Sequence, residues 1–148
     1  MKPIKITMHS KNISLEKAWD LITDIEKFPQ RVKYVKKVKV FGTGVGSEWD
    51  DITTILWIPM RMRHTVKSFD KNKEYSFIIR FLSNGYMEQK YAISQKDGKS
   101  TIQALVTYDL GNKLLNITLG SILKKRLENM LVSSFQKTGG TVYTENEI

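Results

Sequence analysis

Hydrophobic and polar positions follow a helical period near the start of this chain. Residues 14–23 predict an amphipathic helix capped by Ser14, with an apolar face made of Ala18, Trp19, Leu21 and Ile22. Trp19 is interpreted as a core residue, because amphipathic helices bury such side chains without any functional need. Asp24 is expected to cap a second, shorter helix, and Pro29 to shape the exit from it.

The period changes to two on either side of these helices. Residues 2–8 form a basic amphipathic pattern, and residues 36–41 alternate valine and lysine, so both predict strands. A tight turn at Ile58 and Pro59 would set the next hairpin. Its inward pairs would be Trp57–Met60, Ile55–Met62, Thr53–His64, Asp51–Val66 and Trp49–Ser68. Its outward pairs would be Asp50–Lys67, Thr54–Arg63 and Leu56–Arg61.

Two further turns extend the inward face, which continues through Tyr75. A three-residue loop over 83–85, with Gly85 left-handed in a bulge, keeps charged residues off that face. The expected pairs are Phe81–Met87, Ile79–Gln89 and Phe77–Tyr91. A two-residue turn at Asp97-Gly98 then pairs Ile93–Ile102, Tyr91–Ala104, Gln89–Val106 and Met87–Tyr108.

The C-terminal third predicts one long helix over residues 113–137 that covers the open face of the sheet. Its apolar stripe is Leu115, Leu119, Ile122, Leu123, Leu127, Met130, Leu131 and Phe135. Gly139 and Gly140 are expected to stop it. We therefore expect one domain over residues 1–138, followed by a polar, mobile tail over residues 139–148.

This order of elements resembles the START-related helix-grip superfamily, which includes polyketide cyclase/dehydrase-like, pollen-allergen-like and coenzyme-Q-binding proteins. The resemblance rests on residues 18–24, 28–29, 35–40 and 44–47 and on the amphipathic C-terminal helix. Residues 24–29 also look like the opening segment of coenzyme-Q-binding members. The resemblance implies an α+β fold in which a curved antiparallel sheet of about seven strands wraps around the long C-terminal helix. Two short helices would lie between the first and second strands.

Composition narrows the function classes. The 148 residues carry a net charge of +9 and no cysteine, which excludes disulfides and thiolate chemistry. The start lacks the apolar stretch of a secretory signal and no run is long enough to span a membrane, so a cytoplasmic protein is expected. The lysines are spread over strand faces and turns, and no nucleic-acid motif accompanies them, so nucleic acid is not an expected partner. A basic exterior does suit transient contact with an anionic membrane surface.

The glycine-rich segment 42–47 is interpreted as a turn between two strands. It lacks the lysine of a phosphate-binding loop, and its glycines lead into a strand. The two histidines show no metal-ligand spacing, so neither a metal nor a cofactor is expected.

Polar residues interrupt the inward face, a pattern typical of a small-molecule site. The tryptophans and methionines either line an adaptable pocket or fill an ordinary core. The candidate ligand-binding residues are Trp49, Asp51, Thr53, Ile55, Trp57, Met62, His64, Phe77, Ile79, Gln89, Tyr91, Tyr108, Leu119, Leu123 and Leu127.

Asp51 is expected one diagonal step from His64, within reach of a water bridge. The pair either forms a structural contact or makes His64 a general base oriented by a carboxylate.

The leading hypothesis is non-catalytic binding or transport of a hydrophobic or amphipathic molecule, such as a lipid, isoprenoid, quinone or polycyclic aromatic. The alternative is an enzyme of the polyketide aromatase/cyclase or dehydratase type. There His64, oriented by Asp51, would abstract a proton while Tyr75, Tyr91 or Tyr108 donates to the developing enolate.

Overall fold

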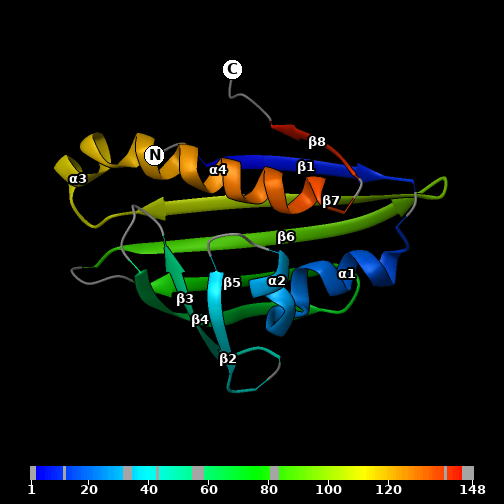
Figure 1. The fold of residues 1–148 in the computed structure, drawn as a ribbon, viewed down its shortest axis with the longest axis horizontal. Helices are drawn as coiled ribbons and strands as arrows, with labels where there is room; N and C mark the ends of the chain where they lie inside the picture. The colour runs from blue at the N-terminus through cyan, green and yellow to red at the C-terminus, as the bar shows by residue number, and fades with distance from the viewer. Residues whose placement is uncertain are drawn as a thin grey trace.

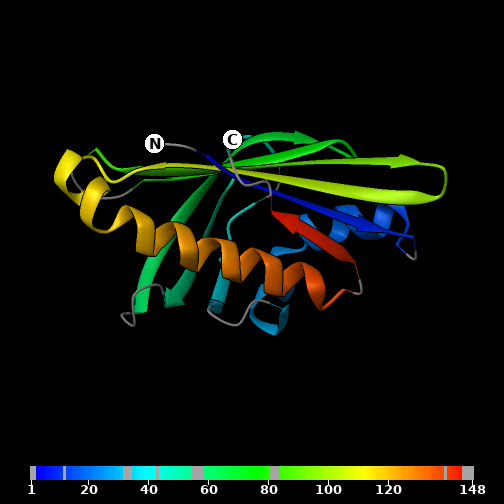
Figure 2. The same cartoon turned by 90° about the horizontal axis from the view of Figure 1, so that it is seen from above.

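The protein is built from one curved sheet with its helices gathered on one side (Figures 1 and 2). The computed structural model describes residues 3–11, 13–31, 35–42, 44–54, 59–80, 84–138 and 140–144. The strands are β1 (Ile4–Ser10), β2 (Val35–Val40), β3 (Glu48–Thr54), β4 (Pro59–Asp70), β5 (Glu74–Arg80), β6 (Tyr86–Lys96), β7 (Lys99–Asp109) and β8 (Thr141–Thr144). The helices are α1 (Leu15–Thr23), the 3-10 turn η1 (Ile25–Lys27), α2 (Phe28–Arg31), α3 (Lys113–Thr118) and α4 (Gly120–Gln136).

The strands follow the order β2-β3-β4-β5-β6-β7-β1-β8, and neighbouring strands are antiparallel. Burial alternates along β6 and β7, so one face of the sheet forms the core and the other faces solvent. Figure 2 shows α1, α2 and α4 on the same side of the curved sheet. The expected α+β architecture is confirmed, with the short helices between the first two strands.

The first helical region forms largely as its sequence predicts. The Ser14 hydroxyl accepts a hydrogen bond from the Lys17 amide at 3.2 Å and so caps α1. Trp19 is buried and meets the Phe69 ring edge-on at 5.2 Å, which confirms its place in the core. Pro29 does not shape the exit as expected, because it lies in the first turn of α2, where its missing N–H costs no helical hydrogen bond.

The register of the β3–β4 hairpin differs from the prediction by four residues. Trp49 pairs with His64 and Asp51 with Met62, in place of Ser68 and Val66. Thr54 and Pro59 form the last described pair, so this register does not centre the turn on Ile58 and Pro59, and residues 55–58 lie outside the described residues. Because four is an even number, every described side chain keeps its expected face.

The β5–β6 hairpin shows a similar correction of two residues. Phe77 pairs with Gln89, where Tyr91 was expected, and Arg80 and Tyr86 form the last described pair. Asn84 takes the left-handed conformation, with a φ of 67°, that was expected of Gly85. The β6–β7 hairpin matches the prediction in full, and its turn residues Asp97 and Gly98 have φ angles of 53° and 73°.

The single C-terminal helix that we expected is two helices, α3 and α4, which meet at Leu119. Glycine at 120 has low helix propensity, and the Tyr108 hydroxyl donates a hydrogen bond to its carbonyl at 2.8 Å. Only α4 presents a continuous buried stripe to the sheet, made of Leu123, Leu127, Leu131 and Phe135. The expectation that Leu115, Leu119 and Ile122 pack on the sheet is wrong, because all three are exposed.

The end of the chain also differs from the expected mobile tail. Residues 141–144 form β8, which pairs with β1 at the sheet edge and makes the eighth strand. At Gly140 the chain passes so close to β1 that an added Cβ would lie 2.7 Å from the Met8 side chain. Gly139, the other expected helix stop, lies outside the described residues.

Candidate functional site

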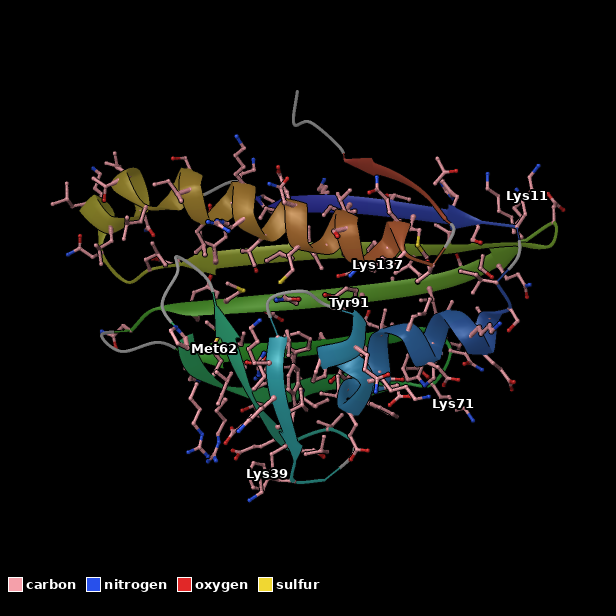
Figure 3. The ribbon with its side chains drawn as sticks, viewed as in Figure 1. Lys11, Lys39, Met62, Lys71, Tyr91 and Lys137 are labelled. Atoms are coloured by element: carbon pink, nitrogen blue, oxygen red, sulfur yellow. The ribbon has the colours of Figure 1, made fainter. Side chains whose placement is uncertain are left out.

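A cavity lies between α4, the short helices and the concave side of the sheet. The space open to the centre of a water molecule is about 90 Å³, which holds several waters at roughly 10–15 Å³ each. Figure 3 labels Tyr91 on β6 and Met62 on β4, and both residues line this space. The lining residues are Leu21, Ile22, Phe28, Val35, Trp49, Asp51, Met62, His64, Phe77, Ile79, Met87, Gln89, Tyr91, Leu127, Met130, Leu131, Ser134, Phe135 and Thr138.

One polar group in this cavity is formed by Asp51 and His64. The extended backbone of β3 and β4 brings them together diagonally, with Asp51 Oδ2 3.8 Å from His64 Nε2 and both side chains buried. At 3.8 Å the contact is an ion-pair distance if the ring is protonated, and it is too long for a hydrogen bond. The Trp49 ring stacks on the imidazole, with centroids 3.4 Å apart and planes 9° apart.

Burial fixes the protonation state of His64. It holds the pKa of this imidazole well below its usual range, and the nearby backbone carbonyls of Met62 and Trp49 offset the effect only in part. His64 is therefore neutral at pH 7. Its Nδ1 atom makes no hydrogen bond to a residue in the part of the chain that the structure describes.

A second polar group lies on β6. The Tyr91 hydroxyl donates a hydrogen bond to Gln89 Oε1 at 2.6 Å, and among the described residues Gln89 Nε2 donates to the sulfur of Met87, a weak acceptor, at 3.5 Å. Burial raises the pKa of the Tyr91 hydroxyl, so the phenol stays protonated. Gln89 thus retains donor capacity inside an apolar cavity.

Most of the candidate residues from the sequence meet in this one cavity. They are Trp49, Asp51, Met62, His64, Phe77, Ile79, Gln89, Tyr91 and Leu127. Three candidates do not line it, because Leu119 is exposed, Leu123 packs in the core and Tyr108 reaches Gly120. Thr53 is described in its backbone alone, and Ile55 and Trp57 lie outside the described residues.

Tyr75, one of the proposed proton donors, lines a different hollow. This second space of about 190 Å³, by the same measure, lies among η1, Phe69 and the glycines at 42 and 44, and Trp49 lines both spaces. Burial raises the pKa of Tyr75 to about 12. Among the three tyrosines considered, Tyr91 alone lines the first cavity.

The sequence reasoning missed the contributions of the helices to the cavity. Leu21 and Ile22 were recognised as an apolar face, and Leu131 and Phe135 as part of a stripe, but strand pairing does not say where helices lie on a sheet. Ser134 and Thr138 are polar residues four positions apart that lie beside this apolar stripe. Polar side chains at helical spacing next to an apolar stripe are a sequence signal that could have identified them.

The outer face of the same strands carries a contrasting cluster. Asp50 accepts hydrogen bonds from Arg61 at 2.6 and 3.1 Å and from Arg63 at 2.8 and 3.1 Å. The Arg63 guanidinium is the leading cause that lowers the Asp50 pKa to about 2. The expected partner of Asp50 was Lys67, and the corrected register replaces it with Arg63.

Neither a protein-family model nor a curated protein sequence matches this chain. Solved structures do. A START superfamily protein from Mycobacterium smegmatis superposes with a TM-score of 0.75 at 13% identity, over 93% of this chain and 97% of that chain. The chain has the START-like helix-grip fold.

Two enzymes share the helix-grip fold with this chain. The Zhui aromatase/cyclase from Streptomyces sp. R1128 has a TM-score of 0.72 at 9% identity, over 91% of this chain and 89% of that chain. Norcoclaurine synthase from Thalictrum flavum, solved with dopamine and hydroxybenzaldehyde, has a TM-score of 0.67 at 16% identity, over 93% of this chain and 86% of that chain. At these identities the likeness establishes the fold and leaves the activity to the residues of the cavity.

In the part of the chain that the structure describes, no three His, Asp or Glu side chains come together as a set of metal ligands. The described helices also include none that is long and apolar enough to cross a membrane.

Proposed function

We propose that this protein binds a hydrophobic or amphipathic small molecule in the cavity between the sheet and α4. The observation that carries the proposal is a mostly apolar lining in which a few buried polar groups converge, the usual form of a small-molecule site. The proposed ligand classes are lipids, isoprenoids, quinones and polycyclic aromatics. Norcoclaurine synthase, a solved protein of this fold, was determined in complex with dopamine and hydroxybenzaldehyde, which supports a ligand-binding role for the cavity.

The size of the cavity bounds the ligand. About 90 Å³ accepts a slender chain or a single ring without any change in the protein. A larger polycycle requires neighbouring side chains to move. Met62, Met87 and Met130 line the cavity, and their unbranched thioethers change rotamer at low cost. The proposal therefore favours an isoprenoid or acyl chain, or a substituted ring, over a rigid polycycle.

The polar lining bounds the head group. The described lining includes Asp51 and neutral His64 but no lysine or arginine, so a carboxylate head would find no cationic partner among the described lining residues. A hydroxyl or carbonyl finds partners instead in His64 Nδ1 and Gln89 Nε2. These groups support a neutral ligand with one hydrogen-bonding end.

Neighbouring serines on α4 provide a matched test. Ser134 lines the cavity, with its hydroxyl donating to the Met130 carbonyl at 2.7 Å, while Ser133 is exposed. Ser134→Phe should fill the cavity, and Ser133→Phe adds the same side chain in solvent. We expect isoprenoid alcohols or quinones to raise the melting temperature of the wild type and of Ser133→Phe but not of Ser134→Phe. No rise for the wild type across the panel, or an equal rise in Ser134→Phe, contradicts the proposal.

Catalysis is the second candidate function, because Asp51 and His64 lie together inside the cavity. Proton abstraction needs a base whose pKa is close to the working pH. Burial lowers the His64 pKa, and the Tyr91 hydroxyl already donates a hydrogen bond to Gln89, so both groups are poorly poised for proton transfer. We therefore rank an aromatase/cyclase or dehydratase activity behind binding.

Two variants separate these functions once a ligand is known. His64→Ala and Asp51→Asn are assayed in parallel for turnover of that ligand and for its affinity. Retained affinity with lost turnover would promote catalysis above binding. Unchanged turnover in both variants would remove the His64–Asp51 mechanism.

The proposal also includes transient contact with an anionic membrane, from which an apolar ligand is taken or to which it is delivered. Support comes from the net charge of +9, which favours approach to anionic lipid. Lys11, Lys39 and Lys71 lie at separate places around the molecule in Figure 3, so charge alone does not select a contact surface.

A further inference from the structure

The helix α3 has its apolar side turned away from the protein. Leu114 and Ile117 are 67% and 68% exposed, and three further apolar side chains nearby are at least one-third exposed. Together these five account for most of the exposed large hydrophobic side chains among the described residues. We define them as the α3 surface: Leu114, Leu115, Ile117, Leu119 and Ile122.

Hydrogen bonds hold α3 in this orientation. Asn116, on the opposite side of the helix, donates to Asp109 Oδ1 at 2.9 Å and accepts from the Leu110 amide at 2.8 Å. Asn112 caps the helix through the amides of Leu114 and Leu115. The polar side of α3 is thus attached to the end of β7. In an ordinary surface helix the apolar side faces the protein, so the orientation of α3 is reversed.

The surroundings of the α3 surface are basic. Residues 109–128 include Lys113, Lys124, Lys125 and Arg126, against two acids: Asp109, whose carboxylate accepts hydrogen bonds from Asn116 and Gly111, and Glu128. Figures 1 and 2 place α3 at one end of the molecule, away from α1 and from the β6–β7 hairpin. An apolar patch flanked by cations at an extremity of a domain matches the interface of an anionic membrane.

We propose that the α3 surface docks on anionic lipid, with its apolar side chains entering the boundary between head groups and acyl chains. A second copy of this chain is a poorer occupant, because a twofold contact would bring the lysines of one copy against those of the other. The inference localises the membrane contact proposed above. It does not depend on whether the cavity binds a ligand.

Co-sedimentation of the full chain with vesicles tests this proposal. We expect binding to phosphatidylcholine vesicles that contain phosphatidylserine, and much weaker binding to phosphatidylcholine alone. Leu114→Ser with Ile117→Ser should lower the partition coefficient at least about tenfold, because two apolar side chains no longer enter the interface. Val45→Ser is the matched control, since Val45 is 68% exposed at a different place and its replacement should leave binding unchanged.

A charge-matched pair tests the electrostatic part. Lys113→Gln with Lys125→Gln should lower partitioning about 25-fold, at about fivefold for each lysine near the surface. The double variant Lys96→Gln, Lys99→Gln removes the same charge at the opposite end of the molecule and should change the partition coefficient by less than about twofold.

Three results would overturn the proposal. They are an equal loss of vesicle binding in the test and control variants, no binding of the wild type to anionic vesicles, and a dimer in the absence of vesicles that the double variant Leu114→Ser, Ile117→Ser dissociates. Ligand-induced changes in melting temperature, recorded without vesicles, should be the same in all these variants. A failure of cavity binding is therefore seen separately from a failure of docking.

Discussion

Asp50 and Asp51 are neighbours on β3, yet the sheet places them in opposite electrostatic environments. Both are buried, but Asp50 faces outward and accepts four hydrogen bonds from Arg61 and Arg63. Asp51 faces inward, where its carboxylate lies 3.8 Å from the neutral ring of His64. Burial alone therefore does not distinguish a structural carboxylate from a candidate ligand-binding one, whereas the charge and position of the neighbouring groups do.

The largest expected effect is on stability at the outward carboxylate. Asp50→Ala should lower the free energy of unfolding by about 2 kcal/mol, since the pKa of this carboxyl is lowered from 3.8 to about 2 and each unit corresponds to about 1.4 kcal/mol. Urea denaturation at pH 7 measures it. Ligand affinity should stay the same, and a parallel loss of affinity would show that the two faces are coupled.

The pH dependence of unfolding should separate the two regions. Because the pKa of His64 is lower in the folded state than in the unfolded state, the unfolded state binds more protons as the pH falls. The free energy of unfolding should therefore decrease once the pH falls below the ordinary histidine pKa near 6.5. The loss should approach about 1.4 kcal/mol per pH unit. Asp50 has a depressed pKa as well, so its contribution is present above about pH 4 and is lost as pH falls towards 2.

Denaturant titrations from pH 7 to pH 5 test this separation. His64→Phe should remove the decrease between pH 6.5 and 5 and keep the stacking on Trp49, whereas Asp50→Ala should retain the decrease. A wild type whose stability is flat over that range would contradict a buried neutral imidazole.

The smallest expected effect on stability belongs to the inward carboxylate. Asp51→Asn should change the free energy of unfolding by less than about 1 kcal/mol, because neutral His64 is not left as an unpaired charge. Its effect should appear in ligand preference. Titration calorimetry with an alcohol and a carboxylic acid of equal chain length should show the preference shift towards the acid by at least about tenfold. An unchanged preference would place the head group elsewhere in the cavity.

The faces of the strands could be predicted from the sequence, but their register could not. Side chains alternate with a period of two, so shifts of four residues in β3–β4 and two in β5–β6 leave Asp51, His64 and Gln89 on the inward face. Register depends on how many residues close each hairpin. The Asp97-Gly98 turn carries that information, and Ile58-Pro59 does not.

Two features of the site were beyond the sequence for physical reasons. Apolar spacing continues from α3 into α4, so it does not reveal that Asn116 holds α3 with its apolar side outward. Spacing within the strands likewise does not show where α4 crosses them, which is why Ser134 was missed and Leu119 was wrongly included. Both depend on tertiary contacts between elements far apart in the chain.

Native mass spectrometry of protein purified without detergent tests the central claim most directly. We expect the wild type and Ser133→Phe to carry one neutral, apolar small molecule that dissociates on activation, and Ser134→Phe to be free of it, since Ser134 lines the cavity and Ser133 does not. The same adduct on Ser134→Phe, or three ligand-free proteins that also take up nothing from the panel of isoprenoids, quinones and aromatics, would contradict the account.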